Sequence, residues 1–231
     1  LMNMETVRVA YDFWKENGLK ALIKKSKHKI QGIDNDYDYA EWYDLTKPTE
    51  EELAAQRTAV FEYMPKLSVV IPAYKTPERY LKEMLNSILA QTYENWEICI
   101  ADGSPAGESC ERVLKRYAEQ DRRFKYVVLG ENKGISGNTN AAMDMAAGDF
   151  IVLADHDDTL PPHALYEVVK AINEHPEADV IYSDEDKMDM DGGALFDPHF
   201  KPDFNIDLLR SVNYICHLFV VSHDLAARTG G

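Results

Sequence analysis

The segment Asp155–Asp158, which reads DHDD, carries the densest group of reactive side chains in this 231-residue sequence. Three carboxylates within four residues repel one another unless a cation lies between them. Hard oxygen ligands on a tight turn suit Mg²⁺ or Mn²⁺, and an ion held there could neutralise a diphosphate group. We therefore predict a divalent-metal site in this segment.

Other polar side chains follow other apolar runs. Asp102 comes directly after the run 96–101, where it could accept a hydrogen bond from a base or a ribose, and Asp184 and Glu185 follow the run 180–183. A single acidic turn is most often a solvated loop or a helix cap. Three such turns at strand ends of one sheet would lie along the same edge, which favours a site over three unrelated loops.

The elements that must position these residues alternate between strands and helices from Leu67 onward. Short apolar runs bounded by turn residues predict strands, and longer runs with apolar residues three and four apart predict helices. The expected strands are 67–72, 96–101, 124–129, 150–154 and 180–183, and the expected helices are 78–91, 109–120, 135–147 and 162–175. This pattern predicts an α/β fold, a mostly parallel doubly wound sheet with helices on both faces. Ligands bind outside the carboxyl ends of the strands in such sheets.

Composition excludes several other classes of protein. The net charge of −15 argues against general nucleic-acid binding, because no broad surface would neutralise phosphates. No run approaches the roughly 18 apolar residues of a membrane span. The glycine-rich signatures of dinucleotide-binding and P-loop enzymes are absent from the sequence. The three cysteines are too scattered for a disulfide framework, which indicates a reducing compartment and predicts a cytoplasmic location.

The first 65 residues differ in charge pattern and are expected to form a helical N-terminal extension before a main domain at 66–231. Residues 7–14 and 19–30 have helical spacing, and the second segment is rich in lysine. A basic amphipathic helix can lie on an anionic membrane surface, so peripheral contact with the inner face of the cell membrane is one expectation, and a solvated helix packed on the main domain is the other. We expect a loop at 34–42 and a helix from Thr49, with Glu52 completing its cap, to about Tyr63.

Five segments have a characteristic order and spacing: SVVIPAYKTP (68–77), LNSILAQTYENWEICIADGS (85–104), ENKGISGNTNAAMDMAAGDFIVLADHDD (131–158), SDEDK (183–187) and FKPDFNIDLLRSVNYICHL (200–218). Together these segments resemble the family-2 glycosyltransferases, inverting enzymes with the GT-A fold. The resemblance covers about residues 66–231, and its last two segments are similar to the subgroup that builds bacterial cell-surface polysaccharides.

The resemblance implies a role for each matching position. Asp157 would bind Mn²⁺ or Mg²⁺, Asp155 would meet the ribose or the metal, and Asp158 is left open as a further ligand. Asp102 would hydrogen-bond the base of the nucleotide. The residues implied to line the nucleotide are Pro72, Ala73, Tyr74, Asp102, Lys133, Asn138, Asp155 and His156. Lys75 stands where the family more often has asparagine, which puts a secondary contact in doubt.

The implied reaction moves a sugar from a UDP- or dTDP-sugar donor to a saccharide or lipid-linked saccharide acceptor. The acceptor hydroxyl needs a base, which in the family lies in an acidic motif beyond Gly231, so we expect this chain to lack it. Asp184 and Glu185 are weaker candidates for the base within the sequence.

Two other functions remain open from the sequence. One is a non-catalytic module that binds a nucleotide sugar. The other is a phosphatase-type hydrolase, because the segment 155–159 also fits the Asp-x-Asp-x-Thr nucleophile loop. For two further features we favour a structural role: His217 as a hydrogen-bonded core histidine rather than a contact of the metal or the acceptor, and residues 189–193 as a hairpin turn rather than a calcium loop.

Overall fold

The computed structural model describes Lys15, residues 39–190 and residues 194–230. The chain divides into two compact units, Leu1–Thr46 and Lys47–Gly231. In the first unit, α2 spans Tyr39–Thr46, so the loop expected at 34–42 is wrong for its last four residues. The helices expected at 7–14 and 19–30, and the membrane contact proposed for the second of them, lie outside the described residues. Among the described helices, none is long and apolar enough to cross a membrane.

The second unit begins with α3, Glu50–Thr58. Thr49 caps this helix as expected, because its hydroxyl accepts from the Glu52 N–H while the Glu52 carboxylate accepts from the Thr49 N–H. The helix ends earlier than the expected Tyr63. The chain becomes extended at Ala59, and Phe61 then packs against Tyr166 with ring centroids 5.1 Å apart. These tertiary contacts replace the last helical turn.

A six-stranded sheet forms the centre of the second unit among the described residues, with the strand order β3-β2-β1-β4-β8-β5. Strands β3, β2, β1 and β4 are parallel neighbours, whereas β8 runs antiparallel between β4 and β5. The strands are β1 Leu67–Ala73, β2 Trp96–Asp102, β3 Phe124–Val128, β4 Phe150–Leu153, β5 Val180–Tyr182 and β8 Phe219–Ser222. The five predicted strands are confirmed. Strand β8 is an additional strand that the sequence pattern did not predict, and it separates β5 from β4.

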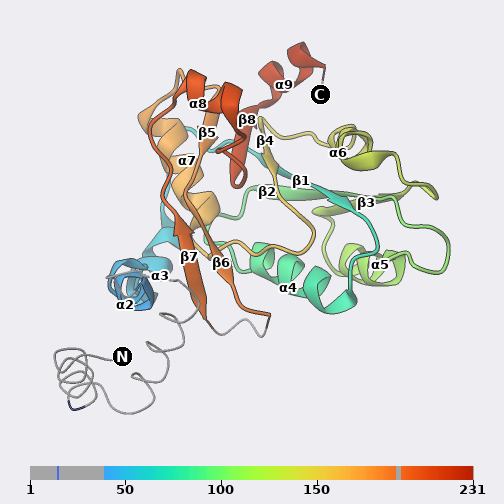
Figure 1. Cartoon of the computed structure of the whole chain (residues 1–231), viewed down its shortest axis with the longest axis horizontal. Helices are drawn as coiled ribbons and strands as arrows, with labels where there is room; N and C mark the ends of the chain where they lie inside the picture. Colours follow the sequence, from blue (N-terminus) through green and yellow to red (C-terminus); the bar gives the residue numbers. More distant parts are fainter. Residues whose placement is uncertain (1–14, 16–38, 191–193, 231) are drawn as a thin grey trace, which may run out of the picture. The chain divides into compact units, whose positions relative to one another are not determined.

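Helices cover both faces of this sheet (Figure 1). Residues alternate along β1, so that Val69 and Ile71 enter the core beneath α4, α5 and α7, while Val70 enters the smaller core beneath α6 and α9. The helices are α4 Glu78–Leu89, α5 Glu111–Gln120, α6 Gly134–Met143, α7 Ala164–Glu174, α8 Ile206–Ser211 and α9 His223–Thr229. The four helices predicted between the strands are confirmed, with ends that differ by a few residues.

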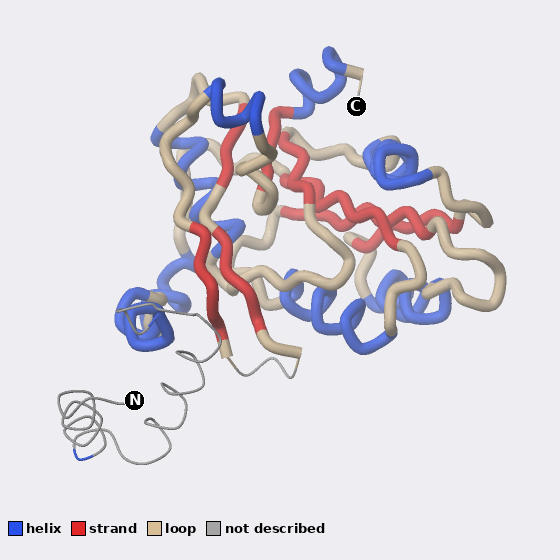
Figure 2. Tube along the Cα trace, in the orientation of Figure 1, coloured by secondary structure: helices blue, strands red, loops and turns tan. Residues whose placement is uncertain are grey.

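A second sheet consists of β6, Glu185–Met188, and β7, Leu195–His199, which pair antiparallel beside the main sheet (Figure 2). The Asp189 N–H donates to the Ala194 carbonyl at 3.0 Å where the two strands join. The expected hairpin is therefore confirmed, although residues 191–193 of its turn lie outside the described part.

A buried carboxylate ties the amino ends of three strands together. Glu97 in β2 is 2% exposed; it pairs with Lys66, lies 2.9 Å from the Lys125 ammonium and accepts from the Ser68 hydroxyl at 2.8 Å. It also accepts from the Ala147 N–H at 2.6 Å, just after α6. Burial alone would raise the pKa of Glu97, but these hydrogen bonds outweigh burial and lower it to about 2.

Candidate active site

Three parallel strands bring the predicted site residues to one edge of the sheet. Ala73 at the end of β1 is in register with Asp102 at the end of β2. On the other side of β1, Val70 is in register with Leu153, the last residue of β4. The loops that follow β1, β2 and β4 therefore start beside one another, as expected for the carboxyl ends of parallel strands.

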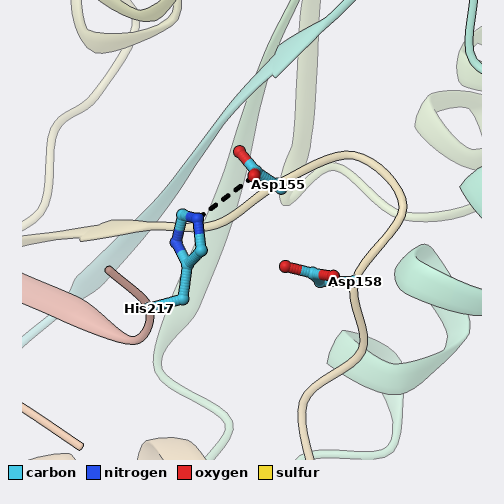
Figure 3. A group of neighbouring side chains, drawn as sticks. All are labelled: Asp155, Asp158 and His217. Atoms are coloured by element: carbon cyan, nitrogen blue, oxygen red, sulfur yellow. Dashed lines mark ion pairs between the residues drawn. The ribbon is translucent and has the colours of Figure 1, made fainter. Parts of the chain in front are cut away.

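The antiparallel strand β8 adds a residue to this edge. Leu153 pairs with Phe219, so the loop that leads into β8 arrives where the loop after β4 departs. Asp155 and His217 consequently face each other, with 3.1 Å between the Asp155 Oδ2 and the His217 Nε2 atoms (Figure 3). The Asp158 side chain points toward the same place from the loop after β4 (Figure 3).

Asp155, Asp158 and His217 form a group that could hold a metal ion. One ligand atom from each of the three lies within 4.8 Å of the others, and it is the one such group in the part of the chain that the structure describes. Two carboxylates and one imidazole fit a divalent cation.

Charges within the group support this fit. The hydrogen bond from His217 lowers the pKa of Asp155, and the same bond raises the pKa of His217. Burial raises the pKa of Asp158, and the neighbouring Asp155 charge raises it further. A cation between the carboxylates would relieve this repulsion and would replace the proton on the imidazole.

Two site residues differ from their predicted positions. Asp157, implied as the principal ligand, is 54% exposed and lies outside the group; its nearest Oδ atom is 3.6 Å from the His156 Nδ1 atom, beyond hydrogen-bond length. Its role as a ligand stays a prediction, but the geometry favours Asp158. The prediction for His217 as a hydrogen-bonded core histidine is wrong, because one ring nitrogen meets Asp155 and the other, buried, has no hydrogen-bond partner among the described residues.

Asp102 is fully buried beneath the same edge. Its Oδ1 atom accepts from the Ser104 N–H at 2.9 Å, and its Oδ2 atom accepts from the Ser109 hydroxyl at 2.6 Å and the Cys110 N–H at 2.9 Å. Burial opposes ionisation, but these bonds keep the pKa of Asp102 below its usual value. Asp102 thus shapes the loop 103–110, and its contact with a base stays a prediction.

Two residues implied to line the nucleotide, Lys133 and Asn138, belong to a hydrogen-bonded turn. Asn138 is 2% exposed; it accepts from the Lys133 N–H at 3.1 Å and donates to Asn132 at 3.1 Å. A Cβ atom on Gly103 would lie 2.6 Å from the Asn138 amide nitrogen, so a larger residue at this position would displace the Asn138 side chain from the end of β2. Asn138 therefore holds the turn, while Lys133 is exposed just before α6.

The end of β1 presents one exposed ring. Pro72 is half-buried, Ala73 is buried and Tyr74 is 39% exposed, so of these three positions Tyr74 offers the largest accessible surface. Lys75, where the family more often has asparagine, forms an ion pair with Glu108 at 3.0 Å and its N–H donates to the Ser104 hydroxyl at 2.7 Å. These contacts join the loops after β1 and β2.

An open pocket of about 460 Å³ adjoins the metal-binding group. Asp158 lies at its border and the β6–β7 hairpin supplies the rest of its lining, which comprises Glu185, Asp186, Lys187, Asp197, Pro198 and His199. The pocket is large enough for a sugar. It lies between the β6–β7 hairpin and Asp158 of the metal-binding group.

Glu185 and Asp184, the candidates for a general base, both have other partners. The Asp184 Oδ1 atom accepts from the Lys201 N–H at 2.7 Å. Partial burial opposes ionisation of Glu185, but hydrogen bonds from His199 and from the His217 N–H hold the pKa of this carboxyl below its usual value. A lowered pKa and occupied oxygens make Glu185 a poor base.

Sequence reasoning missed the pairing of His217 with Asp155. The available signal was the run Leu218–Val221, which is apolar and β-branched and directly follows the histidine. Treating this run as a strand would have placed His217 at a strand start. Its position beside β4 depends on the antiparallel insertion, which no local pattern in the sequence specifies.

Known proteins share both the sequence pattern and the architecture. A family model described as Glycosyl transferase family 2 matches residues 68–218. An uncharacterized protein of Sinorhizobium fredii is 46% identical over 166 residues, which cover 72% of this chain and 18% of that protein. The O-antigen biosynthesis protein RfbC of Myxococcus xanthus is 34% identical over 194 residues, which cover 84% of this chain and 15% of that protein. The chain therefore spans less than a fifth of the length of these two relatives.

Solved structures show the same fold. TarS of S. aureus in complex with UDP-GlcNAc aligns with a TM-score of 0.58 at 23% identity, over 71% of this chain and 47% of that one. The mannosyltransferase PcManGT from Pyrobaculum calidifontis in complex with GDP-Man and Mn²⁺ aligns with a TM-score of 0.53 at 20% identity, over 84% and 52%. These likenesses confirm the predicted GT-A architecture. Since the family model matches well over half of the sequence, the chain belongs to glycosyl transferase family 2.

Proposed function

We propose that this domain transfers a sugar from a nucleoside-diphosphate sugar to a hydroxyl acceptor, with inversion at the anomeric carbon. The observation that carries the proposal is the group of Asp155, Asp158 and His217 at the carboxyl edge of the sheet of a family-2 chain. The similar structures of TarS and PcManGT contain UDP-GlcNAc in one case and GDP-Man with Mn²⁺ in the other. They support a nucleotide sugar as donor and a divalent cation as cofactor.

In this proposal Asp155, Asp158 and His217 hold Mn²⁺ or Mg²⁺ beside the diphosphate. When bound, the ion supplies positive charge where negative charge grows on the leaving diphosphate. Lys133, at the amino end of α6, adds a positive side chain at a helix start, where free N–H groups also favour anions. Tyr74, exposed at the end of β1, provides a ring for the base of the nucleotide.

Bond formation and cleavage then occur at the anomeric carbon. The acceptor oxygen bonds to this carbon from the face opposite the diphosphate, the bond from carbon to the diphosphate oxygen breaks, and the acceptor proton passes to a base. Asp184 and Glu185 have partners in Lys201, His199 and His217. These contacts support the proposal that the base is a group other than this pair.

We further propose a UDP- or dTDP-sugar donor and a saccharide or lipid-linked saccharide acceptor in cell-surface polysaccharide synthesis. The relatives RfbC of Myxococcus xanthus, named for O-antigen biosynthesis, and the chondroitin synthase of Escherichia coli, 28% identical over 163 residues, support this setting. We also propose peripheral contact with the inner face of the cell membrane through the lysine-rich residues 19–30, with the site on the cytoplasmic side.

Calorimetric titration of UDP, dTDP, GDP and ADP, each in Mn²⁺ and in EDTA, tests the nucleotide and metal parts. Tight binding of UDP or dTDP that needs Mn²⁺ is expected. Equal affinity in Mn²⁺ and EDTA would contradict the metal role, and equal affinity for ADP would contradict the choice of base. Release of sugar to water or to an added saccharide then separates a transferase from a module that only binds, which would release none.

The phosphatase-type alternative loses its support. Its nucleophile loop would follow the first strand of the sheet, whereas the segment 155–159 follows β4 in a chain of glycosyl transferase family 2. An assay of phosphate release from a generic phosphomonoester tests this alternative, and no release is expected.

A further inference from the structure

An ion pair between the buried Lys201 and the partly exposed Glu185 binds both main-chain polar groups of His217. The Glu185 Oε2 atom accepts from the His217 N–H at 3.1 Å, and the Lys201 ammonium donates to the His217 carbonyl. The same ammonium donates to the Ile215 carbonyl at 2.6 Å and lies 3.3 Å from the Glu185 Oε2 atom. All three ammonium protons of Lys201 therefore have an acceptor.

The burial of Lys201 is unusual for a lysine. Its side chain is 1% exposed, whereas Glu185 is 30% exposed. Lysine is almost never fully buried unless it is paired, and the cost of removing a charge from water often equals or exceeds what an ion pair returns. Such a pair is therefore weak evidence for stability, and its geometry directs attention to the conformation that it holds.

The segment held by this pair has no regular secondary structure to fix it. Residues 212–218 lie between α8 and β8, and Cys216 has a φ of +41°, a conformation that L-residues rarely adopt. The main-chain hydrogen bonds of His217 thus come from Glu185 and Lys201, on the hairpin strand β6 and just after β7. The imidazole then reaches Asp155 at 3.1 Å.

We propose that Glu185 and Lys201 are positioning residues, which fix the main chain of His217 so that its imidazole completes the metal-binding group with Asp155 and Asp158. The proposal rests on the metal role put forward under the proposed function. It gives Glu185 a role other than general base, and it links the hairpin that lines the pocket to the candidate metal site.

A double-mutant cycle between Lys201 and His217 tests the coupling. Lys201→Met keeps the length of the side chain and removes its charge, and Lys170→Met is the matched control at an exposed lysine that pairs with Glu167 on α7. Manganese itself is the probe, titrated by calorimetry and by its electron paramagnetic resonance signal. Loss of an outer partner of a metal ligand typically weakens metal binding about 10–100-fold.

We expect Lys201→Met to weaken Mn²⁺ binding about 10–100-fold and Lys170→Met to leave it unchanged. In the Lys201→Met background, His217→Ala should cause little further loss of Mn²⁺ affinity. Additive losses in the double variant would overturn the inference, and so would unchanged Mn²⁺ affinity in Lys201→Met. If Lys201→Met does not fold, the double variant Glu185→Gln/Lys201→Met removes both charges and takes its place in the cycle.

A second readout separates failure of this inference from failure of the proposed function. Long-range ¹⁵N–¹H spectra record the histidine rings without any metal. Shifted His217 resonances in Lys201→Met with unshifted His175 resonances are expected, since His175 is exposed after α7. Unchanged His217 resonances in Lys201→Met would overturn the positioning role, whether or not the unmodified protein binds Mn²⁺. Failure of the unmodified protein to bind Mn²⁺ would count against the proposed function and would leave the positioning role to the resonances.

Discussion

Asp157 and Asp158 are neighbours in the sequence with different surroundings. Asp158 joins Asp155 and His217, and its pKa is raised by burial and then by the Asp155 charge. Asp157 is 54% exposed beside His156. A carboxylate that shares a site with another carboxylate gains most from a cation, so we propose Asp158 as the better ligand of the two.

Replacing each of these carboxylates by its amide should separate their roles. Asp158→Asn is expected to weaken Mn²⁺-dependent UDP binding by about tenfold or more, and Asp157→Asn by less than about threefold, because only the first removes charge from the metal-binding group. Calorimetry in Mn²⁺ measures both, with melting temperatures as the control for folding. A larger loss in Asp157→Asn would restore that residue as the principal ligand.

Asp102 should act on stability as well as on recognition. Asp102→Ala leaves the N–H groups of Ser104 and Cys110 without their acceptor in a buried place, which should lower the free energy of unfolding by about 2–4 kcal/mol. Urea denaturation measures this change. A preference for UDP over ADP that is unchanged in Asp102→Ala would contradict a base-selecting role, because this variant has no acceptor for the base. An unchanged free energy of unfolding in the same variant would contradict the structural role.

At the scale of elements, β8 decides the composition of the site. It enters between β4 and β5 in the antiparallel direction, so the residue that precedes it lies beside the residue that follows β4. The β6–β7 hairpin lies before β8 in the chain and supplies the Glu185 and Lys201 contacts to His217. The site thus combines one loop from the parallel part of the sheet with one from its antiparallel strand.

The Glu97 cluster at the opposite ends of the strands makes stability depend on pH. The pKa of Glu97 is lowered to about 2 in the folded protein, so its contribution is present above the unfolded value of about 4.3 and is lost as the pH falls toward 2. Glu97→Gln should therefore lower the free energy of unfolding by about 1–3 kcal/mol at about pH 7, and this difference should shrink between about pH 5 and pH 3.

Urea denaturation at several pH values measures this dependence, with the exposed Glu119→Gln as the matched control in α5. A difference between Glu97→Gln and the unmodified protein that stays constant from pH 7 to pH 3 would show that the carboxylate charge is not the cause.

At the scale of the whole second unit, the fold has a core that needs no metal. Two layers of apolar side chains cover the faces of the sheet, and the metal-binding group lies in loops at its edge. Folding and metal binding should therefore be separable, in contrast to small domains that a structural metal holds folded.

Removing divalent metal should leave the melting temperature of the free protein nearly unchanged. The additional stabilisation by UDP should disappear, because a ligand raises stability only as far as it binds the folded state. Thermal unfolding in Mn²⁺, in EDTA, and in each with UDP measures this. A large fall in melting temperature on adding EDTA alone would instead indicate a structural metal.

The sequence alone determined much of the fold and part of the site. Strand β1 and helix α4 were predictable because apolar runs and helical spacing are local properties, and Thr49 was recognisable as a cap because its partner Glu52 lies three residues away. The positions of Asp102 and Asp155 at strand ends could be predicted from the same periodicity. The acidic cluster could be predicted from the residue types alone.

Only the tertiary structure decided which of these residues meet. The pairing of His217 with Asp155 joins positions 62 residues apart in the sequence (217 − 155) through an antiparallel strand, and the buried Lys201 resembled an ordinary surface lysine in the sequence. Side-chain direction within an irregular loop brings Asp158, and not Asp157, into the group with Asp155 and His217. Such outcomes depend on packing between distant segments, whose energies no local pattern records.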